Sequence, residues 1–230
     1  MQVQQPLINC LERIISEHTV ISISGESGTG KTSLALYLIA NLVKNPVCCI
    51  WVQASEPFPR VRLEGMFRKN TDQQEYVLQN TYIAPKKVMY SYSDQARFFS
   101  TLLDSIFPPD LQFLIIDNIS HHLRYELTIR LGIDKKVRLM NEFYDTVIYP
   151  LILKCQREKV ILILLHEVSF DVSTQQTRPF FYKLYERIKG VQLNLNKSLF
   201  SQERTMEIDT GSNRVSFGFT MSDHGFYFEL

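Results

Sequence analysis

The sequence predicts an α/β fold, in which a mostly parallel central sheet is flanked by helices and extended at its carboxyl end by antiparallel hairpins. Apolar runs such as 47–52 and 160–165 are continuous rather than alternating, which is typical of strands that are covered on both faces. Helical patterns separate these runs as far as residue 189, as in parallel sheets. After Gly190, short strand patterns follow one another with turn residues between them, which indicates hairpins.

Length and composition fit a single domain that spans residues 1–230. The chain is 45% hydrophobic and 21% charged, as in ordinary soluble globular proteins, and its net charge of +1 gives no overall attraction to nucleic acid or membrane. No apolar run is long enough to span a bilayer, and no secretory signal pattern is present. The four cysteines lack zinc-site spacing and are expected to be reduced thiols. We expect an intracellular protein without a membrane partner, cytoplasmic, or nuclear if the host is eukaryotic.

The first predicted elements are an amphipathic helix over 5–17, a buried strand over 20–24 and an apolar helix over 32–43. Between the strand and the second helix lies GESGTGKT, a complete G-x-x-x-x-G-K-[ST] sequence. Its glycines let backbone N–H groups surround phosphate oxygens at the positive end of the helix dipole. Lys31 is expected to reach the β- and γ-phosphates, and the Thr32 hydroxyl to ligate Mg²⁺. The predicted nucleotide contacts are Gly25, Glu26, Ser27, Gly28, Thr29, Gly30, Lys31, Thr32 and Ser33.

The middle of the chain continues the alternation of strands and helices. A strand over 47–52 is followed by a polar loop over 53–62, at the strand end where ligands sit in parallel sheets. A helix end and a third strand are predicted over 76–84, and a further helix over 93–107.

The strand predicted over 112–117 ends in a single acid, Asp117. In phosphate-loop ATPases an aspartate at this place holds Mg²⁺, because the strand end lies beside the phosphate loop. We therefore predict that Asp117 is the acid on the metal side, together with Thr32. The alternative is an acid that only caps the strand end.

The stretch 121–138 is expected to be a basic connection into a long helix over about 134–158, which Pro150 kinks or breaks. The adjacent His121 and His122 are interpreted as polar loop residues rather than metal ligands, since neighbouring side chains point in different directions.

The most apolar run, 160–165, predicts a central strand that ends in His166 and Glu167, at the same sheet edge as Asp117. The polar stretch 169–179 is expected to be a mobile loop. After it we predict a short basic helix over 180–189 and strands over 192–196, 205–209, 214–220 and 226–229.

In the order and spacing of these segments, the chain resembles the ATPase core of the RecA/RadA recombinase superfamily, and most of all its archaeal RadB paralogues. The resemblance runs from Leu7 to Phe226 and rests on GESGTGKTS, YVLQNTYIA, LIIDNISHHLRYEL, KVRLMNEF, a strand ending in LLHEV, and TRPFFYKLYERIKGVQLNL. It implies a RecA-like phosphate-loop NTPase fold, with ATP and Mg²⁺ as cofactors and with Lys31 and Asp117 as catalytic residues. Arg62 matches the position that packs against adenine.

Two departures from the family pattern concern hydrolysis. The family's catalytic glutamate falls on Ser55 here, and Glu56 comes one residue later, where an extended loop reverses the side-chain direction. Glu56 becomes the base only if the turn at Pro57 reorients it. The family's Asn-Gln pair that reports the γ-phosphate is replaced by His166 and Glu167, so that an acid faces the triphosphate. By its position in the family pattern, Glu167 is expected to be a nucleotide-binding residue, as is Arg62. We expect a weak ATPase and leave open whether DNA stimulates it.

By the same resemblance, two stretches correspond to loops that contact DNA. The first, around 124–138, has five basic residues and Tyr125 and is suited to phosphate contacts and base stacking. The second, 169–178, is nearly uncharged. An ordinary solvated helix face is the alternative. We expect this chain to have neither the family's separate amino-terminal DNA-binding domain nor its polymerisation linker, and therefore to form no long filament. The predicted DNA contacts are Arg124, Tyr125, Arg130, Lys135, Lys136 and Arg138.

Three functional hypotheses follow from the sequence. The first is a RadB-like, ATP-binding paralogue that modulates homologous recombination and DNA repair by contacting single- or double-stranded DNA, a recombinase or another paralogue. The second is a structural subunit of a paralogue complex that binds ATP without hydrolysing it. The third is a KaiC-like regulatory ATPase with no role on DNA.

Overall fold

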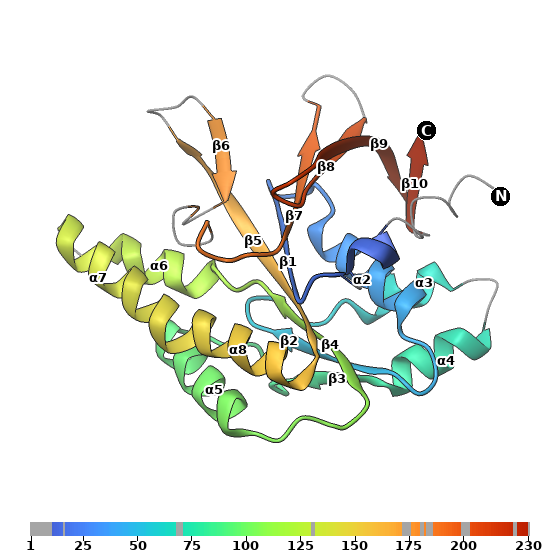
Figure 1. The fold of residues 1–230 in the computed structure, drawn as a ribbon, viewed down its shortest axis with the longest axis horizontal. Coiled ribbons are helices and arrows are strands. Elements are labelled where there is room, and N and C mark those ends of the chain that lie inside the picture. The colour runs from blue at the N-terminus through green and yellow to red at the C-terminus, as the bar shows by residue number, and fades with distance from the viewer. Residues whose placement is uncertain are drawn as a thin grey trace.

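The computed structural model describes residues 11–15, 17–67, 71–129, 132–171, 176–179, 182, 186–198, 203–222 and 225–229. Over these residues the strands form one sheet in the order β10-β9-β8-β7-β1-β5-β4-β2-β3, and β6 pairs with β5 (Figure 1). The strands are β1 (Val20–Gly25), β2 (Cys48–Gln53), β3 (Thr81–Ala84), β4 (Leu111–Asp117), β5 (Ile161–Asp171), β6 (Gln176–Pro179), β7 (Val191–Lys197), β8 (Arg204–Asp209), β9 (Arg214–Ser222) and β10 (Gly225–Glu229).

The centre of the sheet is parallel and its carboxyl-terminal part is antiparallel. β1 pairs in parallel with β5 and β7, β4 pairs with β5 and β2, and β2 pairs with β3. From β7 to β10 each strand pairs antiparallel with the next, as does β5 with β6. The predicted α/β fold with carboxyl-terminal hairpins is therefore confirmed.

Helices cover both faces of the parallel strands. Successive residues of a strand point to opposite faces, so neighbouring residues of one strand contact different groups of helices. Ile21 of β1 packs in one buried cluster with residues of α2, α3 and α4, whereas Val20 lies in a second cluster with residues of α5 to α8. Figure 1 shows these two groups of helices on opposite sides of the sheet. The helices are α2 (Lys31–Leu42), α3 (Arg60–Met66), α4 (Thr71–Gln79), α5 (Tyr92–Asp104), α6 (His121–Ile129), α7 (Ile133–Phe143) and α8 (Tyr149–Glu158).

Three of the antiparallel strands, β8, β9 and β10, contribute residues to the buried cluster that surrounds α2. Met206 of β8, Phe219 of β9 and Phe226 of β10 belong to the same buried cluster as this helix. The ring of Phe226 lies 5.8 Å from that of Tyr37, and the eight residues of α2 from Ser33 to Ala40 are all buried. Such burial explains why the sequence of α2 is apolar on nearly every side rather than along one stripe.

Four predictions of element type or extent were wrong. Residues 121–129 form the helix α6 instead of a connection, and the loop after β2 ends at Pro59, where α3 begins. The long helix is interrupted by a π-helical turn over Tyr144–Ile148, and Pro150 is the second residue of α8, directly after this turn. In the stretch 169–179, the described residues 169–171 and 176–179 are strand residues and not a loop, because β5 continues to Asp171 and pairs with β6.

Two predicted helices lie partly or mostly outside the described residues. The helix over 5–17 is described at 11–15 and 17, where the backbone is helical. Of the helix over 180–189, the described residues are 182 and 186–189.

Candidate functional site

A cavity of about 620 Å³ lies at the carboxyl ends of β1, β2, β4 and β5. The glycine-rich loop after β1 and the first turn of α2 form one side of it, and residues at or after the ends of β2 and β4 form the other. Two residues of β5 and two residues of β9 complete the lining. Its described lining consists of Gly25, Glu26, Ser27, Gly28, Gly30, Lys31, Thr32, Ser33, Ser55, Glu56, Arg62, Asp117, Asn118, His121, Arg124, Glu167, Val168, Met221 and Ser222.

The glycine-rich loop has a backbone that other residues would not adopt. Gly28 and Gly30 have φ angles of 78° and 104°, in the left-handed region that favours glycine. A Cβ at Gly25 would lie 2.5 Å from the Leu195 carbonyl oxygen, which is too close for any side chain. The buried hydroxyl of Thr29 donates to the Glu26 carbonyl at 2.9 Å and closes the turn. The loop is therefore held in shape by its own contacts.

Lys31 opens α2 and folds back over this loop. Its Nζ donates to the carbonyl oxygens of Gly25 and Glu26, at 2.8 and 3.0 Å. Burial lowers the pKa of Lys31, while the nearby carboxylates of Asp117 and Glu167 oppose that shift. A phosphate oxygen is a stronger acceptor than these carbonyls, so the ammonium group is placed to exchange them for an anion.

Thr32 and Asp117, the predicted metal pair, are in direct contact. The Thr32 hydroxyl donates to Oδ2 of Asp117 at 2.9 Å. Burial raises the pKa of Asp117 to about 6, although the hydrogen bond from Thr32 and the charge of Lys31 act in the opposite direction. A desolvated carboxylate beside a hydroxyl oxygen offers the hard oxygen ligands that Mg²⁺ prefers.

The loop after β2 brings both candidates for the water-activating position to the cavity. The backbone N–H of Ala54 donates to the Asp117 carbonyl at 2.8 Å, which fixes the start of this loop against the end of β4. Ser55 is half-buried and Glu56 is exposed, and both line the cavity. Arg62 of α3 reaches the same space and donates to the Ser33 hydroxyl at 3.3 Å.

Glu167 lies beside Gly25, its register partner in β1, and is held by three side chains. Asn118 Nδ2 donates to Oε1 at 3.1 Å, His121 Nδ1 lies 3.2 Å from the same oxygen, and Arg124 donates to Oε2 at 2.8 Å. Burial alone would raise the pKa of Glu167, but the hydrogen bonds from Arg124 and His121 outweigh it and lower the pKa. Glu167 is thus an ionised acid at the edge of the cavity.

His166, the neighbour of Glu167, does not reach the cavity. Its side chain is buried within the sheet, and burial lowers its pKa to about 3. His166 and Glu167 therefore occupy different environments, and of the two only Glu167 lines the cavity.

The described residues among the predicted DNA contacts lie on two helices, α6 and α7. Arg124 lines the cavity, whereas the exposed Tyr125 lies one residue further along α6; Arg130 is outside the described residues. Lys135, Lys136 and Arg138 all belong to α7.

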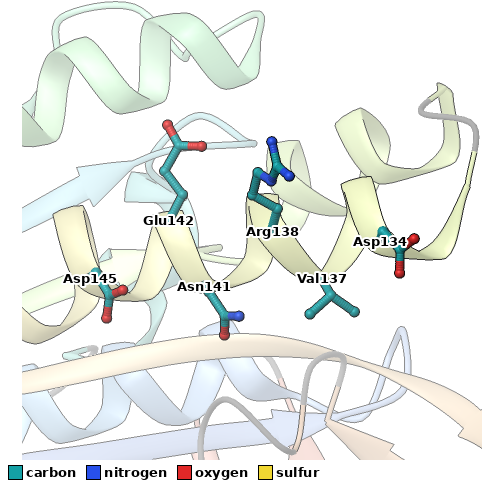
Figure 2. Close-up of a pocket in the computed structure, with 6 residues that line it drawn as sticks. All are labelled: Asp134, Val137, Arg138, Asn141, Glu142 and Asp145. Atoms are coloured by element: carbon teal, nitrogen blue, oxygen red, sulfur yellow. The ribbon is translucent and has the colours of Figure 1, made fainter.

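A shallow groove runs along α7, and its lining includes Arg138 (Figure 2). Arg138 and Glu142 project to one side of the helix there, and Val137 and Asn141 to the other. Asp134 and Asp145 complete the groove, so three acids surround its single arginine. This charge balance does not favour a phosphate contact at Arg138.

Sequence reasoning did not assign Asn118, His121, Met221 or Ser222 to the site. The first two follow Asp117 closely, so their nearness to a strand end was a usable signal. Met221 and Ser222 gave no local signal, because their place in the cavity depends on the pairing of β7 to β10.

The two adjacent histidines have separate partners, as their opposite directions suggested. His122 is buried, and its Nε2 lies 2.9 Å from the Ala54 carbonyl oxygen.

Within the described ranges, no group of three or more His, Cys, Asp or Glu side chains is arranged to hold a metal ion. In the same part of the chain, no helix is long and apolar enough to cross a membrane.

Comparison with known proteins gives a match at the level of structure. No protein-family model and no curated protein sequence matches this chain. Among solved structures, the chain is similar to one titled "Crystal structure of the RadB recombinase", with a TM-score of 0.67 and 20% identity, over 90% of this chain and 89% of that chain. The expected RecA-like fold is thereby confirmed.

Proposed function

We propose that this chain binds Mg-ATP in the cavity at the carboxyl ends of β1, β2, β4 and β5. The observation that supports the proposal most is the contact between Thr32 and Asp117 next to the Lys31 ammonium. The loop N–H groups and the amino terminus of α2 would hold the inner phosphates, and Lys31 would reach the β- and γ-phosphates. Mg²⁺ would be held between the Thr32 hydroxyl and Asp117, where it would neutralise phosphate charge.

The substitution Lys31→Ala tests this site. Removing the ammonium group from the phosphate cradle is expected to abolish ATP binding, measured by titration calorimetry in the presence of Mg²⁺. Lys44→Ala is the matched control, since Lys44 is an exposed lysine just beyond α2 and does not line the cavity. An ATP affinity unchanged by Lys31→Ala would overturn the assignment.

We further propose that ATP is hydrolysed slowly. Ser55 takes the place of the expected general base, and the exposed Glu56 lies one residue beyond it. A base must reach the attacking water through a hydrogen bond, so a displaced carboxylate supports slow turnover. The same observation favours a second candidate, a structural subunit that binds ATP and does not hydrolyse it. Single-turnover measurement separates the two, because product formation within hours fits only the first.

The biological role we propose is that of a RadB-like recombinase paralogue, which modulates homologous recombination and DNA repair through DNA or through a recombinase partner. The fold shared with a structure titled as the RadB recombinase supports this role. A KaiC-like regulatory ATPase is the alternative without DNA. DNA binding that weakens with added salt would favour the recombinase paralogue, and absence of binding at low salt would favour the regulatory ATPase.

A further inference from the structure

Glu167 presents a difficulty for any nucleotide in this cavity. The described lining carries four carboxylates, on Glu26, Glu56, Asp117 and Glu167, against three cationic side chains, on Lys31, Arg62 and Arg124. A triphosphate adds further negative charge. Mg²⁺ between Thr32 and Asp117 would offset part of the repulsion, but the carboxylate of Glu167 still needs a positive partner on its own side of the cavity.

Arg124 is that partner, and the fold fixes its position. The hydroxyl of Ser120 donates to Asn118 Oδ1 at 2.8 Å and accepts the backbone N–H of Glu167 at 3.2 Å. The first turn of α6 begins at the same serine, because the Arg124 N–H donates to the Ser120 carbonyl at 2.9 Å. Ser120 therefore joins the end of β4, β5 and the first turn of α6, and it sets where the guanidinium can reach.

The two sides of the cavity offer different cations to a nucleotide. Arg62 lies on the side of α3 and donates to Ser33 in the first turn of α2. Arg124 lies on the side of β5, where its partner Glu167 is close enough to influence the Lys31 ammonium. In phosphate-loop proteins this lysine reaches the β- and γ-phosphates. The guanidinium of Arg124 is thus on the side where the terminal phosphate would lie.

We propose that Arg124, positioned by Glu167, binds the terminal phosphate of ATP and so determines the preference of this site for ATP over ADP. The inference rests on the proposed nucleotide site. A guanidinium presents several N–H donors in one plane and can therefore bond a carboxylate and a phosphate at the same time. Glu167 is a positioning residue in this arrangement: it orients Arg124 and makes no contact with the phosphate.

The test compares ATP and ADP affinities by titration calorimetry with Mg²⁺, for the wild type and for Arg124→Gln. Loss of one charged hydrogen-bonding group is expected to weaken ATP binding by about tenfold or more and to leave ADP binding nearly unchanged. Arg97→Gln is the matched control, since Arg97 is an exposed arginine of α5 that does not line the cavity. Arg124→Lys keeps the positive charge but lacks the planar set of N–H donors of a guanidinium. It should therefore weaken ATP binding less than Arg124→Gln.

Repeating the measurement in a Glu167→Gln variant distinguishes two roles of Arg124: binding the phosphate, and neutralising the charge of Glu167. If Arg124 binds the phosphate, Arg124→Gln should weaken ATP binding in the Glu167→Gln background as well. If Arg124 only neutralises Glu167, the Glu167→Gln substitution will restore ATP affinity to the Arg124→Gln variant, and the proposal is wrong. Equal losses for ATP and ADP would also overturn it.

These outcomes differ from failure of the nucleotide site itself. If the wild type binds neither ATP nor ADP, the proposed function is wrong and the assignment of Arg124 falls with it. If both nucleotides bind and the Arg124 variants show no selective loss of ATP, the nucleotide site stands and only the role of Arg124 is rejected. Circular dichroism of each variant verifies that it is folded.

Discussion

At the scale of single residues, burial decides the charge of His166. Burial lowers the pKa of His166 to about 3 in the folded protein, from an ordinary value of 6.5 in the unfolded chain. Protons therefore favour the unfolded chain throughout this interval, and the contribution of His166 to stability falls as the pH decreases below 6.5. At pH 7 the residue is neutral in both states and costs little.

The substitution His166→Asn tests this charge state, because asparagine does not titrate. Between pH 7 and pH 5 the wild type is expected to lose about 2 kcal/mol of unfolding free energy through His166, and the variant should lack that part of the loss. Urea unfolding followed by circular dichroism at the two pH values measures both slopes. Identical slopes would show that the imidazole is not buried as a neutral group.

Glu56 is the candidate general base if the turn at Pro57 directs its carboxylate toward the attacking water. Glu56→Gln keeps the shape of the side chain and removes its basicity, so turnover should fall by about a hundredfold while ATP affinity stays close to wild type. Single-turnover hydrolysis and calorimetry give the two quantities. Glu64→Gln is the matched control, since Glu64 lies in α3, pairs with Arg60 and does not line the cavity. Equal rates for wild type and Glu56→Gln would remove this carboxylate from the mechanism.

At the scale of elements, the basic stretch 121–138, which the sequence analysis treated as one connection, contributes residues to two separate helices, α6 and α7. Arg124 belongs to the cavity, while Lys135 and Lys136 lie on α7, away from it. The spacing of charges along the chain could not reveal this division, because it depends on α6 being a helix that starts at the end of β4. DNA contacts therefore remain a prediction for α7 and the exposed Tyr125.

DNA binding through α7 is tested by the double substitution Lys135→Gln and Lys136→Gln. Each lost phosphate contact should reduce the slope of log affinity against log salt by about one, and DNA affinity at low salt should fall. Lys86→Gln with Lys87→Gln removes the same charge from an exposed loop after β3 and should leave DNA binding unchanged. If both pairs have the same effect, the contact is not specific to α7.

Some elements were predictable because their signal is local. The strand, loop and helix around Lys31 could be predicted within one or two residues, since the glycine pattern and the apolar runs specify them together. The continuation of β5 to Asp171 was missed, because Ser169 and Asp171 are polar and their pairing with β6 is a tertiary contact. The π-helical turn before α8 was not predicted either, because Pro150 indicated a break at residue 150 itself and not before it.

At the scale of the whole molecule, the sequence predicted a mostly parallel sheet with antiparallel hairpins at its carboxyl end, but it predicted neither β6 nor the order of the strands. Continuous apolar runs mark strands covered on both faces, and closely spaced strands mark hairpins. The order depends on which strand edges meet, which no segment encodes alone. For that reason Met221 and Ser222 reach the cavity without any signal near them, whereas Lys31, Thr32 and Asp117 could be identified from their motifs.

The position of β1 in the middle of the sheet has a consequence for how the protein is made. Its partners are β5 and β7, so that Val20 pairs with Leu162 and Ile21 with Val191. A ribosome releases β1 early, yet both neighbouring strands emerge only after most of the chain has been synthesised. Closing such long separations is slow, and Ile21 and Ile23 stay uncovered meanwhile. The phosphate loop therefore takes its shape late in folding, and the incomplete nascent chain is the form most prone to aggregation.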